Sequence, residues 1–132
     1  MVVSTMLADH WVGVLDQGDE ITDPDMTKIE QAIRALDGSE RTLVLLKTDG
    51  VAHMGIGGGT ANVYFVYVTF DDVEFLAPTI PVTEPGTMVM NIGGQEGEYS
   101  KEHCVDLAVA LSAARAFAAS GILEPSINWR VV

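Results

Sequence analysis

The sequence has little cysteine, few basic residues and no long hydrophobic run, and each shortage excludes a class of protein. Among 132 residues there is one cysteine, Cys104, so the chain cannot form an internal disulfide, and a reducing, cytoplasmic setting fits best. No apolar run is long enough to cross a bilayer. The segment Met1 to Leu7 lacks a basic flank leading into an apolar core, so we do not expect a secretory signal.

Basic residues are outnumbered by acidic ones. Seven Lys and Arg stand against nineteen Asp and Glu, which gives a formal net charge of −12. Such a chain repels phosphate groups, so neither nucleic acid nor an anionic membrane is expected as a partner. A basic protein would be attracted, and steering of this kind raises association rates by roughly 10- to 1000-fold at low salt. Charge alone leaves solubility as an equally good explanation.

The N-terminal part predicts one strand and one helix. A lead-in strand is expected around Trp11 to Leu15, followed by an acidic turn over residues 16–20. Asp23 is a suitable N-cap for the helix, Pro24 suits its first position, and Gly38 ends it. Apolar residues then recur at steps of three and four, which predicts one buried face. They are Met26, Ile29, Ile33 and Leu36.

A β-hairpin is predicted after this helix. The segments Thr42 to Thr48 and Val51 to Ile56 flank the pair Asp49-Gly50, which favours a two-residue turn between antiparallel strands. With that turn, Leu46 would face His53 across the hairpin.

The glycine cluster Gly55 to Gly59 suggests a phosphate-binding loop at first sight. Such a loop joins a strand to a helix N-terminus and usually brings a lysine. Here it joins two predicted strands, and no Lys or Arg lies between Lys47 and Lys101. A wide hairpin or bulge at the sheet edge is the better interpretation.

The rest of the chain completes an α+β pattern. Asn62 to Phe70 is apolar or aromatic on both alternate faces, which predicts a strand in the middle of the sheet. A second helix starts at Asp106, with Ser100 as an alternative cap, and ends at Gly121. The remaining elements are a weak strand, a further strand, this helix and a last strand, at Val73–Leu76, Thr87–Ile92, Leu107–Ala119 and Ile127–Val131. We therefore expect a single domain over residues 1–132, with a mostly antiparallel sheet of about five to seven strands and two main helices packed on it.

No residue pattern predicts catalysis or metal binding. The three histidines do not lie at metal-ligand spacing, and His103 and Cys104 are adjacent, so in a strand their side chains would point to opposite faces. Cys104 and Trp129 are expected in the core. Paired carboxylates such as Asp19-Glu20 lie in turns, without the apolar surroundings that separate the pKa values of an acid and a base. We therefore expect no catalytic residue, no metal and no cofactor.

Several segments together resemble a known family. They are the Asp-Pro start of the first helix, the glycine cluster after the hairpin, the aromatic strand, and the last third of the chain. That last third, Met90 to Trp129, reads MNIGGQEGEYSKEHCVDLAVALSAARAFAASGILEPSINW. In order and spacing, residues 22–130 resemble the first-numbered immunity-protein family of bacterial polymorphic toxin systems. Family members commonly carry an acidic or amide residue after the last Trp, where this chain has Arg130.

The resemblance implies a cytoplasmic protein that binds a cognate toxin and blocks its active site. Toxins paired with this family are often nucleic-acid deaminases, with nucleases as a further class. An acidic protein suits the basic groove that such enzymes need. We expect the contact surface in two acidic loops, because the segment 71–102 has seven carboxylates and one lysine. The toxin-binding candidates are Asp71, Asp72, Glu74, Gln95, Glu96, Glu98 and Tyr99.

Two other functions compete with this one. The first is an acidic binding or chaperone-like module whose partner is not a toxin. The second is a small hydrolase that uses clustered carboxylates, which predicts a pocket holding an Asp or Glu with a strongly perturbed pKa.

Overall fold

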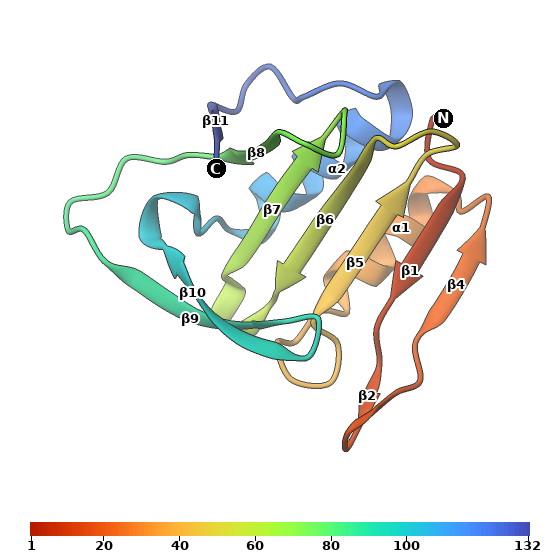
Figure 1. Cartoon of the computed structure of the whole chain (residues 1–132), viewed down its shortest axis with the longest axis horizontal. Coiled ribbons are helices and arrows are strands. Elements are labelled where there is room, and N and C mark those ends of the chain that lie inside the picture. Colours follow the sequence, from red (N-terminus) through yellow and green to blue (C-terminus); the bar gives the residue numbers. More distant parts are fainter.

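The computed structural model describes residues 1–132 and is built around one antiparallel sheet with two helices behind it (Figure 1). Every neighbouring pair in this seven-stranded sheet is antiparallel, which confirms the predicted α+β class. In spatial order the strands are β11 (Trp129–Val131), β8 (Phe75–Pro78), β7 (Tyr64–Thr69), β6 (His53–Gly58), β5 (Leu43–Lys47), β1 (Thr5–Ala8) and β4 (Asp19–Thr22).

Two further hairpins stand outside this sheet. One is formed by β2 (Trp11–Val12) and β3 (Leu15–Asp16), and the other by β9 (Thr87–Ile92) and β10 (Gln95–Ser100). In Figure 1 the first hairpin projects below the sheet, and the second crosses in front of it, on the side away from the helices. Neither hairpin shares a backbone ladder with the main sheet.

The first helix, α1 (Met26–Arg34), has the predicted buried face but a different start. Its N-cap is Asp25, whose carboxylate accepts a hydrogen bond from the backbone N–H of Lys28. Asp23 therefore does not cap the helix; it has φ +51° and lies in the preceding turn. Of the predicted face, Met26 is only half-buried and the other three residues are buried: Ile29, Ile33 and Leu36.

The second helix, α2 (Leu107–Ser120), agrees with its sequence signals at both ends. The Asp106 carboxylate accepts from the backbone N–H of Val109, and Gly121 ends the helix with φ +67°. Neither helix is long and apolar enough to cross a membrane. Two short 3₁₀ turns, Thr60–Asn62 and Lys101–His103, complete the helical elements.

The N-terminal prediction of one strand followed by a turn is wrong. The segment contains β1, the β2–β3 hairpin and β4. Residues 19–22, half of which were predicted to be a turn, form the edge strand β4, because Leu7 of β1 pairs with Glu20. This pairing joins two segments separated by the β2–β3 hairpin, so no local residue pattern predicts it.

The predicted register of the β5–β6 hairpin is also wrong, by one residue. Leu46 pairs with Met54, and His53 pairs with Lys47. The turn has three residues rather than two, because the N–H of Thr48 donates to the carbonyl of Ala52. A one-residue shift moves side chains to the other face of a sheet, so His53 leaves the core side and Met54 enters it.

The core lies between the helices and the sheet. Alternate residues of the strands point to this side and are buried, as strand geometry requires. They include Met6, Val44, Leu46, Met54, Ile56, Val66 and Val68. From α2 they meet Leu111, Ala114 and Phe117, while Trp129 packs at the margin of the same core. Cys104 is buried, as expected.

The buried carboxylate of Asp9 links the ends of two strands of the main sheet to the two small hairpins. Asp9, which is 9% exposed, accepts hydrogen bonds from the backbone N–H groups of Thr42 (2.7 Å) and Leu43 (2.8 Å) and from the indole N–H of Trp11 (2.8 Å). The Thr42 hydroxyl donates to the same carboxylate and accepts from the N–H of Gly94, 3.1 Å away. Asp9 thereby fastens β1, β5, the β2–β3 hairpin and, through Thr42, the β9–β10 hairpin.

Replacing this carboxylate should destabilise the fold markedly. Asp9→Ala leaves two backbone donors and the Trp11 indole without their acceptor, and each buried unsatisfied donor costs about 1–3 kcal/mol. We expect urea denaturation to show a loss of at least about 3 kcal/mol. Asp49→Ala, at an exposed turn, is the control and should change stability by less than about 0.5 kcal/mol. Equal stability of the two variants would contradict the role of Asp9.

Candidate functional site

The face of the main sheet away from the helices carries a row of aromatic rings. Phe65 and Tyr67 of β7, His53 of β6 and Phe75 of β8 all occupy the alternate positions to the buried core residues. The Tyr67 ring lies 5.4 Å from the Phe75 ring and 5.6 Å from the His53 ring, measured between centroids. All four side chains are half-buried, so this face is apolar but still reachable from solvent.

The glycine cluster makes room for side chains on this face. A Cβ on Gly55 would lie 2.1 Å from Cε2 of Tyr67, and one on Gly57 would lie 2.5 Å from Cγ2 of Ile92. The prediction of a bulge at the sheet edge is therefore wrong: three of these glycines lie within β6, which pairs with a strand on each side. They allow a ring and the β9–β10 hairpin to approach the sheet backbone.

The β9–β10 hairpin contains the second group of toxin-binding candidates. The segment was predicted to be an acidic loop, but only Gly93-Gly94 forms a turn, and Gln95 onward is strand β10. Tyr99 points toward the sheet, where its ring lies 4.9 Å from that of Phe65. Glu96 and Glu98 occupy the opposite set of alternate positions and are exposed, so their carboxylates face solvent.

The first group of candidates, Asp71, Asp72 and Glu74, follows the other end of β7. The Asp71 carboxylate is occupied locally, because it accepts from the backbone N–H groups of Val73 and Glu74, each at 2.9 Å. These hydrogen bonds, from Glu74 first and then Val73, hold the pKa of Asp71 below its usual value. Asp72 and Glu74 are exposed, and Asp72 has φ +62°.

The two acidic segments do not form one cluster. They lie at opposite ends of β7, and the β9–β10 hairpin is at the lower end in Figure 1. The aromatic row runs between them on the same open face, from Tyr99 and Phe65 to Tyr67 and Phe75. The resulting surface is an apolar strip with carboxylates at both ends, which we call the open face.

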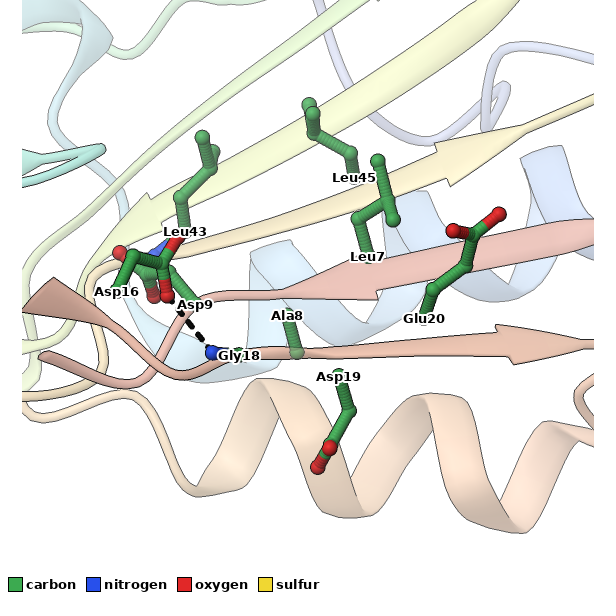
Figure 2. Close-up of a pocket in the computed structure, with 9 residues that line it drawn as sticks. All are labelled: Leu7, Ala8, Asp9, Asp16, Gly18, Asp19, Glu20, Leu43 and Leu45. Atoms are coloured by element: carbon green, nitrogen blue, oxygen red, sulfur yellow. Dashed lines mark hydrogen bonds between the residues drawn. The ribbon is translucent and has the colours of Figure 1, made fainter.

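A hollow of about 340 Å³ extends this face toward β1 and β4. In Figure 2 the side chains of Leu7, Leu45 and Glu20 point to one side of the sheet, whereas Asp19 points to the helix side. Leucines line the hollow, and Asp9 and Asp16 close its end. The Asp16 carboxylate accepts from the N–H of Gly18, 2.9 Å away.

Titratable groups on the molecule form no recognisable reaction centre. No group of three or more His, Cys, Asp or Glu side chains is arranged to hold a metal ion. Burial raises the pKa of the Cys104 thiol, which disfavours the nucleophilic thiolate. His103 is buried and its Nδ1 contacts the carbonyl oxygen of Pro78 at 2.8 Å.

Comparison with known proteins decides the family. Residues 14–131, from the middle of the β2–β3 hairpin to the last strand, match the family described as immunity protein Imm1. The chain belongs to the Imm1 family. Its members are immunity proteins, so the function of this chain is to neutralise a toxin, and its partner is a cognate toxin. No curated protein matches the chain.

The aromatic row of this immunity protein was missed in the sequence. Apolar and aromatic residues on both faces of β7 indicated a central strand, but they did not show which face the helices would cover. Tyr67 and Phe65 alternate with the core residues Val66 and Val68. The sequence therefore showed two alternating sets of residues, but not which set faces the core. His53 was placed on the wrong side by the register error.

The close approach of the β9–β10 hairpin to Gly57 can be tested by adding one methyl group. Gly57→Ala should push Ile92 away, detach the β9–β10 hairpin and destabilise the protein by about 1–3 kcal/mol. Hydrogen exchange should show lost protection over residues 87–100. Gly50→Ala is the control, since its new Cβ would have no neighbour closer than 4.0 Å. Unchanged protection in Gly57→Ala would show that the hairpin does not depend on this contact.

The open face can also be probed through tyrosine ionisation. Burial raises the pKa of Tyr67, and the nearby charge of Asp72 raises it further, whereas burial alone raises that of Tyr99. Asp72→Asn should therefore lower the pKa of Tyr67 and leave that of Tyr99 unchanged, as read by NMR of ¹³C-labelled tyrosine. Because the folded pKa of Tyr67 is raised, its stabilising contribution is complete below pH about 10 and is lost as the pH rises through the folded value. If the pKa of Tyr67 is the same in Asp72→Asn as in the wild type, the Asp72 carboxylate does not lie close to the Tyr67 ring.

Proposed function

We propose that this immunity protein neutralises a toxin that acts on nucleic acid, and that it does so by covering the toxin's basic active-site groove. The open face supplies the contact, with acidic residues at its two ends and aromatic rings between them. The surface would act in the cytoplasm, where the nucleic acid of the producing cell must be protected. We infer a deaminase as the toxin class, with a nuclease as the second class.

The observation that carries the proposal is the orientation of Glu96 and Glu98. Both carboxylates lie on the solvent side of a hairpin that stands in front of the sheet, and neither makes a hydrogen bond or ion pair within the chain. Two exposed carboxylates two residues apart on one strand can contact successive cations of a groove that normally holds phosphates. The overall charge of −12 adds long-range attraction to such a groove.

The rings between the acidic ends would supply contact area. Interfaces gain most of their binding free energy from a few buried aromatic or Arg side chains, and charged residues at the rim contribute mainly to the association rate. Tyr67 and Phe75 are half-buried and already fixed by packing, so little side-chain entropy would be lost on binding. The residues that we assign to the acidic ends of the proposed interface, as contact or supporting residues, are Asp71, Asp72, Glu74, Gln95, Glu96, Glu98 and Tyr99.

Within this set the local contacts support different proposed roles. Asp71 is committed to its own turn, so it would hold Asp72 and Glu74 in position rather than touch the toxin. Tyr99 packs on Phe65, so it would anchor the hairpin and offer only one side of its ring. Glu96 and Glu98 remain the residues best placed for direct contact.

A carboxylate-dependent hydrolase fits this structure less well than a binding protein. Hydrogen bonds to Glu30, Asp37 and Asp71 hold the pKa of each of these carboxyl groups below its usual value. A general acid needs the opposite shift, which apolar burial would produce. Glu30 is held by the guanidinium of Arg115, 2.6 Å away, on the helix side.

Charge reversal tests the proposed contact. Glu96→Lys with Glu98→Lys should slow association with the cognate toxin domain and reduce the salt dependence of the association rate, because steering charges are lost. Stopped-flow or biolayer measurements at two ionic strengths give both quantities.

The control must change the net charge equally. Asp49→Lys with Glu84→Lys reverses two exposed carboxylates that do not belong to the proposed contact set. An equal effect in both variants would show that only the total charge matters, and a slower association in the control alone would place the contact away from Glu96 and Glu98. Growth rescue of cells that express the toxin domain tests the function itself, and wild-type protein that neither rescues nor binds would refute it.

A further inference from the structure

The β2–β3 hairpin, residues 11–16, ends in an apolar tip that is largely exposed to solvent. Val12, Val14 and Leu15 are 51%, 91% and 62% exposed. Gly13, at φ +64°, makes the two-residue turn and has no atom within 4 Å of where its Cβ would be. We call this element the finger. In Figure 1 it extends below the lower ends of β1 and β4.

The base of the finger is held firmly. The indole of Trp11 donates to Asp9, and the Trp11 backbone N–H donates to the carbonyl of Glu40, 2.7 Å away. The Asp16 carboxylate accepts from the N–H groups of His10 (3.0 Å) and Gly18 (2.9 Å). A small two-stranded hairpin is marginal alone, so these contacts are what keep the tip in one position.

The apolar tip does not serve the protein's own core. Three adjacent β-branched or aliphatic side chains exposed on a rigid protrusion contribute no internal packing, whereas polar residues would suit the same turn. A protruding apolar group on a preorganised support is typical of an element that enters a hollow in a partner, because little entropy is lost on binding.

The position of the finger identifies which partner it would meet. The Trp11 ring lies against the turn of the β9–β10 hairpin, so closely that a Cβ on Gly94 would be 2.4 Å from Cζ2 of the indole. The finger is therefore continuous with the hairpin that presents Glu96 and Glu98. The net charge of −12 disfavours a second copy of the chain and an anionic lipid surface, and it favours a basic protein.

We propose that the tip of the finger inserts into an apolar hollow of the toxin domain, next to the basic surface contacted by the β9–β10 hairpin. This inference rests on the proposed function and adds a second contact of different chemistry. Charged contacts mainly set the association rate, whereas a buried apolar anchor mainly sets the dissociation rate. The two contacts should therefore respond differently to mutation.

The test is a variant with Val14→Ser and Leu15→Ser, measured against the toxin domain by biolayer interferometry. We expect the complex to dissociate at least about 10-fold faster, with the association rate and its salt dependence unchanged. Val14→Ser alone should give a smaller change in the same direction. Because these side chains are exposed, the midpoint of urea denaturation should not move, which separates lost binding from lost folding.

The matched control replaces two exposed apolar residues elsewhere, Val51→Ser with Ile122→Ser, and should bind as the wild type does. An unchanged dissociation rate in the tip variant overturns the proposal while leaving the proposed function intact, provided that the wild type binds. Two other results also overturn it: a wild-type dimer, seen by light scattering, that the tip variant abolishes, or binding to anionic lipid vesicles that the tip variant loses. Wild-type protein that does not bind the toxin refutes both proposals at once.

Discussion

The arrangement of the lower half of the molecule depends on the buried carboxylate of Asp9. It accepts two backbone hydrogen bonds at the start of β5, one from the Trp11 indole and one from the Thr42 hydroxyl, so no donor around it is left unsatisfied. Through Thr42 it also fixes Gly94, at the turn of the β9–β10 hairpin. Two hairpins that share no ladder with the main sheet thereby take fixed positions on it. The proposed contact surfaces on these two hairpins therefore depend on the Asp9 carboxylate for their position.

Glycine plays the complementary part on the open face. The helices bury one side of the sheet with ordinary apolar side chains, but the other side must receive a ring and a hairpin close to the backbone. Gly55 and Gly57 leave that space, and they are flanked by Met54 and Ile56, which point to the core. In β6, large side chains toward the core thus alternate with glycines toward the open face. This alternation is what permits a third, partial layer over a two-layer α+β fold.

The sequence predicted features that are encoded locally and failed where distant segments must pair. The cap at Asp106, the glycine end of α2, the buried face of α1 and the strand Thr87–Ile92 all agree with the structure. The register at Leu46, the strands β1, β4 and β10, and the central position of the glycines were missed, because each depends on a partner strand or on the Asp9 network. For the site, the acidic residues were chosen from composition, and their contact with a toxin stays a prediction. The aromatic row was not, since only the helix positions reveal which face of β7 stays open.

The side-chain attachment of the β9–β10 hairpin has an evolutionary consequence. Ile92 and Tyr99 hold it to the sheet, while Glu96 and Glu98 lie on its free side. A substitution on the free side alters no hydrogen bond of the main sheet and no residue of the core. The lineage could therefore follow a diverging toxin by single mutations in this hairpin, at almost no loss of folding stability. If the proposed contact through Glu96 and Glu98 holds, attachment without a shared ladder makes toxin recognition and folding stability separately adjustable.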